Sequence, residues 1–421
     1  MPPPRRAPVR KSIFDPVHGP ITFESAALAL IGTPEFQRLW GIRQTGFAHL
    51  VFPGANHTRL EHSLGAYWVA EQMSARLGLA DDESHRVALG ALLHDLGHGP
   101  FSHSLDAPMV EVLGRPHEAL SRERIEGTDP DWPTDTIEIP RVLERFGYEP
   151  HSVANLIDPG HPGREPRLLR AILHGAIDAD RIDYLQRDAY YTGVAHGAID
   201  AVRLLDTMRP VRGHILFAEK GRSAVEGFLV GRALMYSSVY FHKTVRAAEM
   251  MAQAAVERLP DYPASARGLF RVTDGELLVR LREAGGLSEA LARGLVERRL
   301  YKRAYGWRVV SGASRTRWRR FLAAPPERRA LEDELAARVG APPGSVLIDL
   351  VGLEARSAPE EDWAEVGLLA GERATYPFRG ASPWQTLASR PPADWAVSVY
   401  AARQYASAVT RALGRDRSPI P

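Results

Sequence analysis

The fold is decided by the stretch LLHDLGHGPFSH, residues 92–103, where an apolar helical segment ends abruptly on polar side chains. His94 and Asp95 are adjacent and diverge around a helix axis, yet both can reach a cation in the groove beside the helix. His98 follows four residues later and shares the face of His94. For a lone His-Asp pair, a helix end stopped by Gly97 with satisfied histidines is the better interpretation. The neighbouring sequence must therefore decide.

Helical periodicity extends outward from this stretch in both directions. Apolar residues recur every three or four positions in residues 34–44, 59–79 and 83–98, and again in 167–191 and 224–259. The acidic segment 126–140 contains three prolines and no periodicity, which predicts a surface excursion between helices. The first part of the chain is expected to be helical.

The character of the sequence changes beyond Pro263. Fragments typical of β-strands alternate there with helical segments, and these fragments are GWRVV (306–310), SVLIDLV (345–351) and WAVSVYAA (395–402). We therefore expect a mainly α protein with a disordered leader over residues 1–10, a helical domain over 11–262 and a smaller α+β domain over 263–421.

Composition limits the chemistry. The chain has 421 residues, and its 53 Lys+Arg against 51 Asp+Glu leave a net charge of +2, which argues neither for nor against nucleic acid. Zero cysteines exclude disulfides, thiolate nucleophiles and iron–sulfur clusters, so any metal must rest on His and carboxylates. The basic N-terminus lacks the apolar stretch of a signal peptide, and no run is long enough for a membrane span. A cytoplasmic protein without a membrane partner is expected.

Two further segments supply partners for His94 and Asp95. HTRLEHS (57–63) places His62 near the start of one helix, and AIDADRIDYLQRD (176–188) places Asp180 on another. Two histidines and two aspartates on three separate helices are what a His₂Asp₂ metal site needs. Mixed nitrogen and oxygen ligation without sulfur suits Mn, Fe, Co, Ni or Mg, with Zn less favoured.

Several strings recur in a fixed order that is characteristic of a known family. These strings are DPVHGPI (15–21), TPEFQRLWGIRQ (33–44), VFPGANHTRLEHSLG (51–65), HDLGHGPFSH (94–103) and DADRIDYLQRD (178–188), with a weaker echo in GRALMYSSVYFHK (231–243). The chain resembles the HD-domain metal-dependent phosphohydrolase superfamily, nearest its deoxynucleoside triphosphate triphosphohydrolase branch. The resemblance implies that residues 11–262 form the catalytic HD-type helical core.

The resemblance also implies roles for single residues. The metal ligands would be His62, His94, Asp95 and Asp180. The residues that contact phosphate would be Arg59, His98, Arg181 and Arg232, and the family usually has Lys at the position of Arg181. An arginine there keeps the charge and exchanges a point donor for a planar fork.

A second set would serve acid catalysis and substrate recognition. His103 is the matched general acid, with Asp106, His117 and Glu118 able to orient and polarise it. From its sequence pattern alone, His117 is equally well a surface residue before a helix. The sugar contacts would be Gln44, Tyr184 and Asp188, and Tyr240 would flank the base. A tyrosine ring against C2′ leaves little room for a 2′-hydroxyl.

The chain departs from the family in two places. Positions that bind a regulatory guanine nucleotide in the animal relatives are here Phe14, Pro20, Gly32 and Trp40. None of these can replace a charged contact, so we expect no guanine-nucleotide activation of that kind. Phe241 replaces a polar residue at the base edge, which leaves base preference open.

Three functions follow from these patterns. The favoured one is hydrolysis of a deoxynucleoside triphosphate to deoxynucleoside and tripolyphosphate by a homo-oligomer, a tetramer or larger, with Trp40, Trp68 and the C-terminal domain as interface candidates. The second keeps the metal centre but acts on another nucleotide phosphoester or on single-stranded nucleic-acid ends, for which RTRWRR (315–320) would supply charge. The third is a non-catalytic nucleotide- or nucleic-acid-binding regulator.

Overall fold

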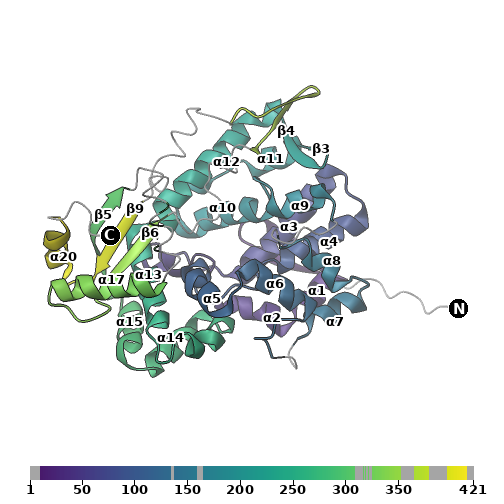
Figure 1. Cartoon of the computed structure of the whole chain (residues 1–421). Helices are drawn as coiled ribbons and strands as arrows, with labels where there is room; N and C mark the ends of the chain where they lie inside the picture. The colour runs from purple at the N-terminus through teal and green to yellow at the C-terminus, as the bar shows by residue number, and fades with distance from the viewer. Residues whose placement is uncertain are drawn as a thin grey trace.

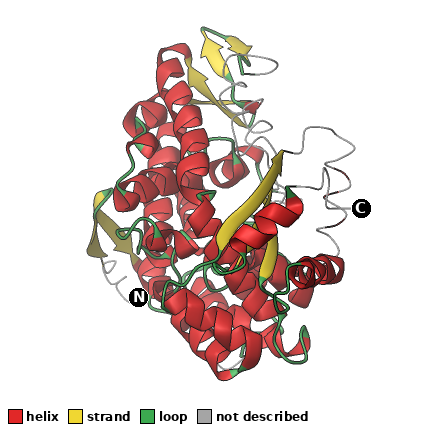
Figure 2. Cartoon of the chain, turned by 90° about the vertical axis from the view of Figure 1, so that its left-hand side faces the viewer, coloured by secondary structure: helices red, strands yellow, loops and turns green. Residues whose placement is uncertain are grey.

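The computed structural model describes residues 10–133, 137–158, 165–308, 325–351, 365–378 and 396–414, together with Thr316, Trp318 and Phe321. Helices make up most of it, and the described strands form three small groups at its periphery (Figure 2). The helix at residues 25–31 lies on one side of the molecule, and the C-terminal sheet lies on the opposite side (Figure 1). The expected mainly α fold with a smaller α+β C-terminal part is confirmed.

The first half of the chain, which contains residues 92–103, folds into ten helices within the described residues. Their bounds are α1 (Ser25–Ile31), α2 (Pro34–Gln37), α3 (Arg59–Leu77), α4 (Asp81–Leu93), α5 (Asp106–Leu113), α6 (His117–Glu126), α7 (Ile139–Arg145), α8 (Pro150–Ala154), α9 (Arg167–His174) and α10 (Ala179–Thr192). Those of the second half are α11 (Ala201–Thr207), α12 (Arg222–Met235), α13 (Lys243–Glu257), α14 (Asp274–Glu283), α15 (Gly286–Val296), α17 (Pro325–Arg338) and α20 (Ala406–Leu413).

Helix α3 is the central element, because it packs against both α4 and α10. It begins with a capping box in which the Thr58 hydroxyl accepts from the Glu61 amide and the Glu61 carboxylate accepts from the Thr58 amide at 2.7 Å. It ends at Gly78, whose φ of 71° suits a residue without a Cβ. These local signals fix the start of α3, and with it the position of His62 one turn later.

The strands form three sheets. A hairpin pairs β1 (Arg10–Asp15) with β2 (Gly19–Glu24), and a second sheet has the order β3-β4-β7-β8, with bounds Met208–Val211, His214–Ala218, Leu368–Ala370 and Arg373–Thr375. The third has the order β5-β9-β6, with bounds Lys302–Arg308, Ala396–Ala401 and Val346–Val351, and it is antiparallel throughout. Where the structure describes them, the three predicted β fragments lie in this sheet.

The hydrophobic core crosses the predicted domain boundary. The largest buried cluster runs from Phe47 to Tyr400 and includes Met251 and Leu277 on either side of residue 263. A separate, smaller cluster lies between the β5-β9-β6 sheet and helices α17 and α20. The division of the chain at residue 263 stays a prediction.

Two local expectations differ from the structure. The periodic stretch 167–191 is broken between α9 and α10 at Gly175, where a Cβ would lie 2.4 Å from the Ala171 carbonyl oxygen. The segment 126–140 does connect helices but is not all at the surface, since Asp129 is 3% exposed and pairs with buried Arg124 at 3.0 Å.

The N-terminal hairpin was not expected. The Asp15 carboxylate accepts from the amides of Val17 and His18 at 2.9 Å, and Gly19 takes a φ of 75°, so the DPVHG string closes a tight turn. Arg10, the last residue of the expected leader, begins β1, and residues 1–9 lie outside the described part. No described helix combines the length and apolar character needed to cross a bilayer.

Candidate functional site

Four side chains from three helical elements converge in what we call the metal group: His62, His94, Asp95 and Asp180. His62 lies on α3, His94 and Asp95 directly follow α4, and Asp180 lies in the first turn of α10. The Nε2 atom of His62 is 3.3 Å from Nε2 of His94 and 3.0 Å from Oδ1 of Asp180. The Nε2 atom of His94 is 3.1 Å from Oδ1 of Asp95 and 3.8 Å from Oδ1 of Asp180. The structure therefore brings together all four ligands that the sequence predicts.

The hydrogen bonds of the His62 and His94 rings are consistent with a cation between the two rings. His62 Nδ1 bonds the Asp183 carboxylate at 2.7 Å, and His94 Nδ1 bonds the Ala91 carbonyl at 2.7 Å. Both partners are acceptors, so Nδ1 of each ring keeps its proton, and the two Nε2 atoms face each other, where they can bind a proton or a metal ion. Two lone pairs 3.3 Å apart repel unless a positive charge lies between them. The residues present therefore fit a divalent metal ion.

Electrostatics also favours positive charge at this place. Burial lowers the pKa of His62, but hydrogen bonds to Asp180 and Asp183 outweigh burial and raise that pKa to about 10. Burial raises the pKa of Asp95, but the Arg59 guanidinium outweighs it and holds that pKa at about 2. The Arg59 Nη1 donates to Asp95 Oδ2 at 2.5 Å. Asp95 is therefore a carboxylate at neutral pH.

A buried network behind the metal group orients His62. Asp183 accepts from His62 on one side, from His18 Nε2 at 2.6 Å on another, and from Arg187 at 2.9 Å. Arg187 also donates to Asp15 at 2.7 Å, so the N-terminal hairpin is tied to this network. Burial raises the pKa of Asp183, but Arg187, His18 and His62 outweigh it and hold that pKa well below its usual range.

The turn that follows α4 is held by backbone contacts to α6. The Ser121 hydroxyl accepts from the Gly97 amide at 2.7 Å and donates to the His94 carbonyl at 2.5 Å. A Cβ at Gly97 would lie 1.9 Å from the His117 carbonyl oxygen, so only glycine permits this approach. Arg38 Nη2 donates to the carbonyls of Leu96 and His98 at 2.9 and 2.6 Å. The turn is thus fixed on both sides.

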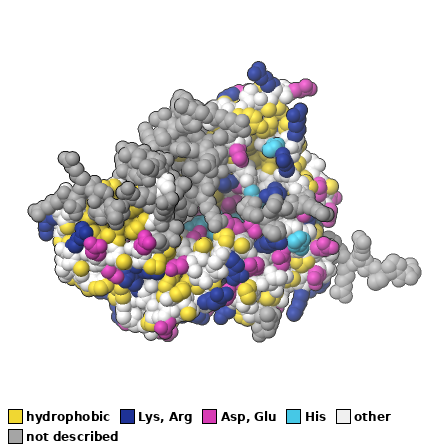
Figure 3. Space-filling model, in the orientation of Figure 1, with side chains coloured by type: hydrophobic (Ala, Val, Ile, Leu, Met, Phe, Trp, Pro, Cys, Tyr) yellow, Lys and Arg dark blue, Asp and Glu magenta, His cyan; other side chains and the backbone are white. Residues whose placement is uncertain are grey.

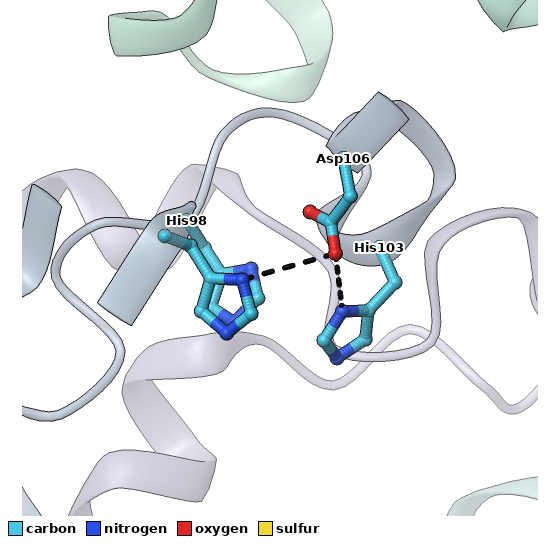
Figure 4. A group of neighbouring side chains, drawn as sticks. His98, His103 and Asp106 are labelled. Atoms are coloured by element: carbon cyan, nitrogen blue, oxygen red, sulfur yellow. Dashed lines mark hydrogen bonds and ion pairs between the residues drawn. The ribbon is translucent and has the colours of Figure 1, made fainter. Parts of the chain in front are cut away.

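A second group lies beside the metal group, and we call it the His-rich cluster: His98, His103, Asp106 and His117. Its donor atoms all lie within 4.8 Å of one another. His103 and Asp106 face each other across a 2.9 Å hydrogen bond (Figure 4). The rings of His98 and His117 are stacked, with centroids 3.8 Å apart. His98 Nε2 lies 3.4 Å from Asp95 Oδ1, so the two groups touch.

The rings of the His-rich cluster differ in protonation. Desolvation lowers the pKa of His103, but the Asp106 carboxylate outweighs it, so that pKa lies above its ordinary value. Burial holds the pKa of His98 well below its ordinary value, with Arg59 adding to the effect. Desolvation likewise lowers the pKa of His117. Among these three rings, His103 is therefore the one whose surroundings favour the protonated form.

One pocket opens onto both groups. The volume of its cavity is about 180 Å³, and it is partly open to solvent. The predicted site residues that line it are Gln44, Arg59, His94, Asp95, His98, His103, His117, Glu118, Asp180 and Tyr184. Its wall combines anionic metal-binding oxygens with cationic and imidazole donors.

Two protein-family models match this chain. The model of the HD domain matches residues 59–188, and the model of the HD associated region matches residues 199–415. The chain belongs to the HD-domain superfamily. The HD match begins at Arg59 and ends at Asp188, so it contains the whole metal group.

Relatives of this HD protein come from all three domains of life. An uncharacterized protein of Methanocaldococcus jannaschii is 38% identical over 298 residues, which cover 69% of this chain and 59% of that protein. Deoxynucleoside triphosphate triphosphohydrolase SAMHD1 of Homo sapiens is 34% identical over 211 residues, which cover 44% of this chain and 34% of that protein. The chain spans less than two thirds of these relatives' lengths.

A solved structure extends the likeness beyond the HD domain. A hypothetical protein from Aquifex aeolicus has a TM-score of 0.73 and 27% identity, covering 96% of this chain and 100% of that one. The expected resemblance to the HD superfamily is confirmed, and the shared fold includes the C-terminal part.

The predicted sugar and base contacts lie at one side of the HD pocket. Tyr184 lines the pocket, and its ring packs edge-on to that of Tyr240 at 6.4 Å. Asp188 accepts from Tyr240 Oη at 2.5 Å and bonds His57 Nε2 at 2.7 Å. Gln44 Oε1 is buried and has no hydrogen-bond partner among the described residues. Gln44 and Tyr184 thus face the pocket, whereas Asp188 and Tyr240 are bonded to each other behind it.

Of the three arginines predicted to contact phosphate, only one is among the described residues that line the pocket. Arg59 lines the pocket and is held by Asp95 and by Ser102 Oγ at 2.8 Å. Arg181 Nη1 instead donates to the Gly175 carbonyl and to Asp178 at 2.7 Å. Arg232 is 2% exposed and lies 5.7 Å from the Tyr236 ring. Arg181 and Arg232 are not among the described residues that line the pocket.

Two supporting residues had no role in the sequence analysis. His18 and His57 each bond a carboxylate of α10, and their exposures of 3% and 0% make them inner parts of the site. Both lie in strings that carried the family resemblance, DPVHGPI and VFPGANHTRLEHSLG. The available signal was a histidine in each of these strings, together with Asp183, an aspartate without an assigned role on the same helix as Asp180.

Proposed function

We propose that this HD protein hydrolyses deoxynucleoside triphosphates to deoxynucleoside and tripolyphosphate. The observation that carries the proposal is that a four-donor metal group shares one pocket with His103, whose pKa the Asp106 carboxylate raises. Relatives named deoxynucleoside triphosphate triphosphohydrolase support the substrate class. Tyr184 and Gln44 line the pocket and supply an aromatic ring and a hydrogen-bonding amide for a nucleoside.

The metal group would hold Mn, Fe, Co, Ni or Mg through His62, His94, Asp95 and Asp180, with Zn less favoured. A bound divalent ion there offsets phosphate charge and lowers the pKa of water. Arg59, His98, Arg181 and Arg232 would bind phosphate oxygens. Arg59 is already fixed by Asp95 and Ser102, so it needs little reordering when a triphosphate arrives.

His103 would donate the proton that the departing 5′-oxygen needs, because an alkoxide is a poor leaving group at neutral pH. Asp106 raises the pKa of His103 and fixes its ring through the 2.9 Å hydrogen bond. His117 and Glu118 would complete the acid–base set. Their neighbouring nitrogen and carboxylate lie 3.6 Å apart.

Tyr184 would pack against the deoxyribose, with Gln44 and Asp188 taking its 3′-hydroxyl and Tyr240 beside the base. The unpartnered Gln44 Oε1 supports such a contact, because it can accept a hydroxyl proton. Asp188 already accepts from Tyr240, so a sugar hydroxyl would share or replace that bond.

A pH profile tests the acid role of His103. In Asp106→Asn the carboxylate that raises the pKa of His103 is gone, so that pKa falls and the acid form disappears at lower pH. We expect the alkaline limb of kcat/KM to move down by about one unit or more. The measurement is kcat/KM against pH at equal metal content. An unmoved limb, or one that moves to higher pH, would contradict the assignment.

A product assay tests the reaction itself. The whole chain, loaded separately with Mn²⁺, Fe²⁺, Co²⁺, Ni²⁺ or Mg²⁺, is incubated with each of the four dNTPs, and products are separated by anion exchange. Tripolyphosphate and deoxynucleoside in equal amounts are expected. Monophosphate release instead would favour another phosphoester or single-stranded nucleic-acid ends. Nucleotide binding without any turnover in all metals would favour a non-catalytic regulator.

A homo-oligomer, tetramer or larger, and a cytoplasmic location belong to the same proposal. Phe14 and Trp40 are 82% and 55% exposed, which suits an interface, whereas Trp68 is stacked on His18 at 4.5 Å. Phe14 pairs with Pro20 in the hairpin, so two of the positions without charged groups for a guanine contact lie side by side. We propose that no guanine nucleotide activates the protein there.

A nucleic-acid partner has less support than a nucleotide substrate. On the face drawn in Figure 3, described Lys and Arg side chains are interspersed with Asp and Glu. Most of the arginine-rich string 315–320 lies outside the described residues. The product assay with single-stranded oligonucleotides decides this alternative.

A further inference from the structure

The His-rich cluster has the composition of a metal site in its own right. His98 comes from the turn after α4, His103 from the 3₁₀ turn Ser102–Leu105, and Asp106 and His117 from the starts of α5 and α6. Each offers one donor atom, and these four atoms lie within 4.8 Å of one another. The His103–Asp106 hydrogen bond uses only part of that donor capacity.

Unsatisfied polar atoms are a second, independent indication. His98 is 1% exposed, and its Nδ1 has no hydrogen-bond partner within the described part of the chain. Asp106 Oδ1 is also buried and without a partner there. A buried nitrogen and a buried carboxylate oxygen left unpaired each cost free energy. A cation beside them would offset that cost.

The spacing of the donors suits tetrahedral coordination after small side-chain shifts. Asp106 Oδ2 lies 2.9 Å from His103 Nδ1 and 3.8 Å from His117 Nδ1. Bonds of about 2.0 Å place tetrahedral donors about 3.3 Å apart, between these two distances. The metal group, with donor pairs from 3.0 to 3.8 Å, has the same spacing.

The two groups differ in the donors that they offer. The metal group combines two imidazoles with two carboxylates, whereas the His-rich cluster combines three imidazoles with one carboxylate. Nitrogen-rich donor sets without sulfur suit Zn²⁺ and its neighbours better than Mg²⁺ or Mn²⁺. The two groups should therefore prefer different ions.

We propose that the His-rich cluster binds a second divalent transition metal, with Zn²⁺ the best fit, in addition to the ion of the metal group. Its ligands are His98, His103, Asp106 and His117. A second consequence rests on the proposed function: an ion on His103 Nδ1 would replace the proton of the His103–Asp106 hydrogen bond, so the ring could no longer act as a cationic acid. Excess Zn²⁺ would then inhibit hydrolysis.

Metal counting tests the site without any turnover. The whole chain, loaded with Mn²⁺, is equilibrated with Zn²⁺ and freed of unbound metal, and total metal per chain is measured by mass spectrometry. Two ions per chain are expected for the wild type. One is expected for His103→Gln and for His117→Gln, since both keep the metal group. The His103 side chain is 66% exposed, so its replacement leaves folding intact.

A matched control separates the cluster from histidine loss in general. His174 also lines the pocket but is not in the cluster, so His174→Gln should retain two ions. One ion in the wild type, or two ions in both cluster variants, would overturn the proposal. The metal count does not depend on whether any nucleotide is hydrolysed. It therefore still tests the second metal site if the product assay shows no hydrolysis.

Inhibition is measured separately. Excess Zn²⁺ should lower the rate of the Mn²⁺-loaded protein by about 10²-fold or more, which is the contribution of a general acid. If two ions bind and the rate is unchanged, the inhibitory consequence is wrong, whereas the site stands.

Discussion

Replacing Asp180 by asparagine is expected to remove the bound metal and to lower hydrolysis by at least about 10³-fold, with little change in folding stability. Metal-ion catalysis is worth several kcal/mol, and each 1.4 kcal/mol is about tenfold in rate. His62, the buried partner of Asp180, keeps its hydrogen bond to the Asp183 carboxylate, so losing the Asp180 charge leaves no buried cation without a partner. The measurements are metal content, hydrolysis rate and urea unfolding.

Asp95→Asn is the informative comparison. It should lose metal and activity to the same degree, but it also removes the carboxylate that neutralises Arg59, which is 2% exposed. Breaking a buried ion pair costs about 3–5 kcal/mol of stability. A protein that keeps its metal and full activity after either replacement would refute the assignment of the metal group.

His103→Gln is expected to lower the rate by about 10²–10⁴-fold while the ion of the metal group is retained. The loss should fall on kcat rather than KM, because proton donation matters only as the bond to the 5′-oxygen breaks. His151→Gln serves as control, since His151 is a surface histidine on α8 whose side chain is 64% exposed. Its rate should equal that of the wild type.

The leaving group offers a sharper check on His103. A triphosphate ester of nitrophenol releases an anion that needs no proton, so the His103→Gln defect should shrink toward nothing on that substrate. An equal defect on both substrates would mean that His103 acts by positioning phosphate and not as an acid.

The sequence was sufficient for elements with strong local signals. Helix α3 is specified by its capping box and periodicity, and the strands β6 and β9 by short apolar runs. The break at Gly175 was missed because the periodicity continues through it, and a close approach to a carbonyl leaves no trace in one sequence. The hairpin β1-β2 was missed because its strands are short and because β1 is mostly exposed.

The residues of the site also divide into those that the sequence could predict and those that it could not. His62, His94, Asp95 and Asp180 could be grouped from residue type and from ordered strings, before any distance was known. The roles of Asp183 and His18 could not, because their partners lie 121 and 165 residues away along the chain. Only the folded backbone shows which buried carboxylate meets which ring.

The Ser121 bridge between the turn after α4 and the start of α6 has a kinetic meaning. Because the Ser121 hydroxyl of α6 bonds both the His94 carbonyl and the Gly97 amide, the spacing between the metal group and the His-rich cluster is set when the chain folds. Gly97 presses the same two segments into van der Waals contact, so neither can slide past the other. The reorganisation that aligns charge and proton is thus completed during folding, and a substrate need contribute little of its binding energy to it.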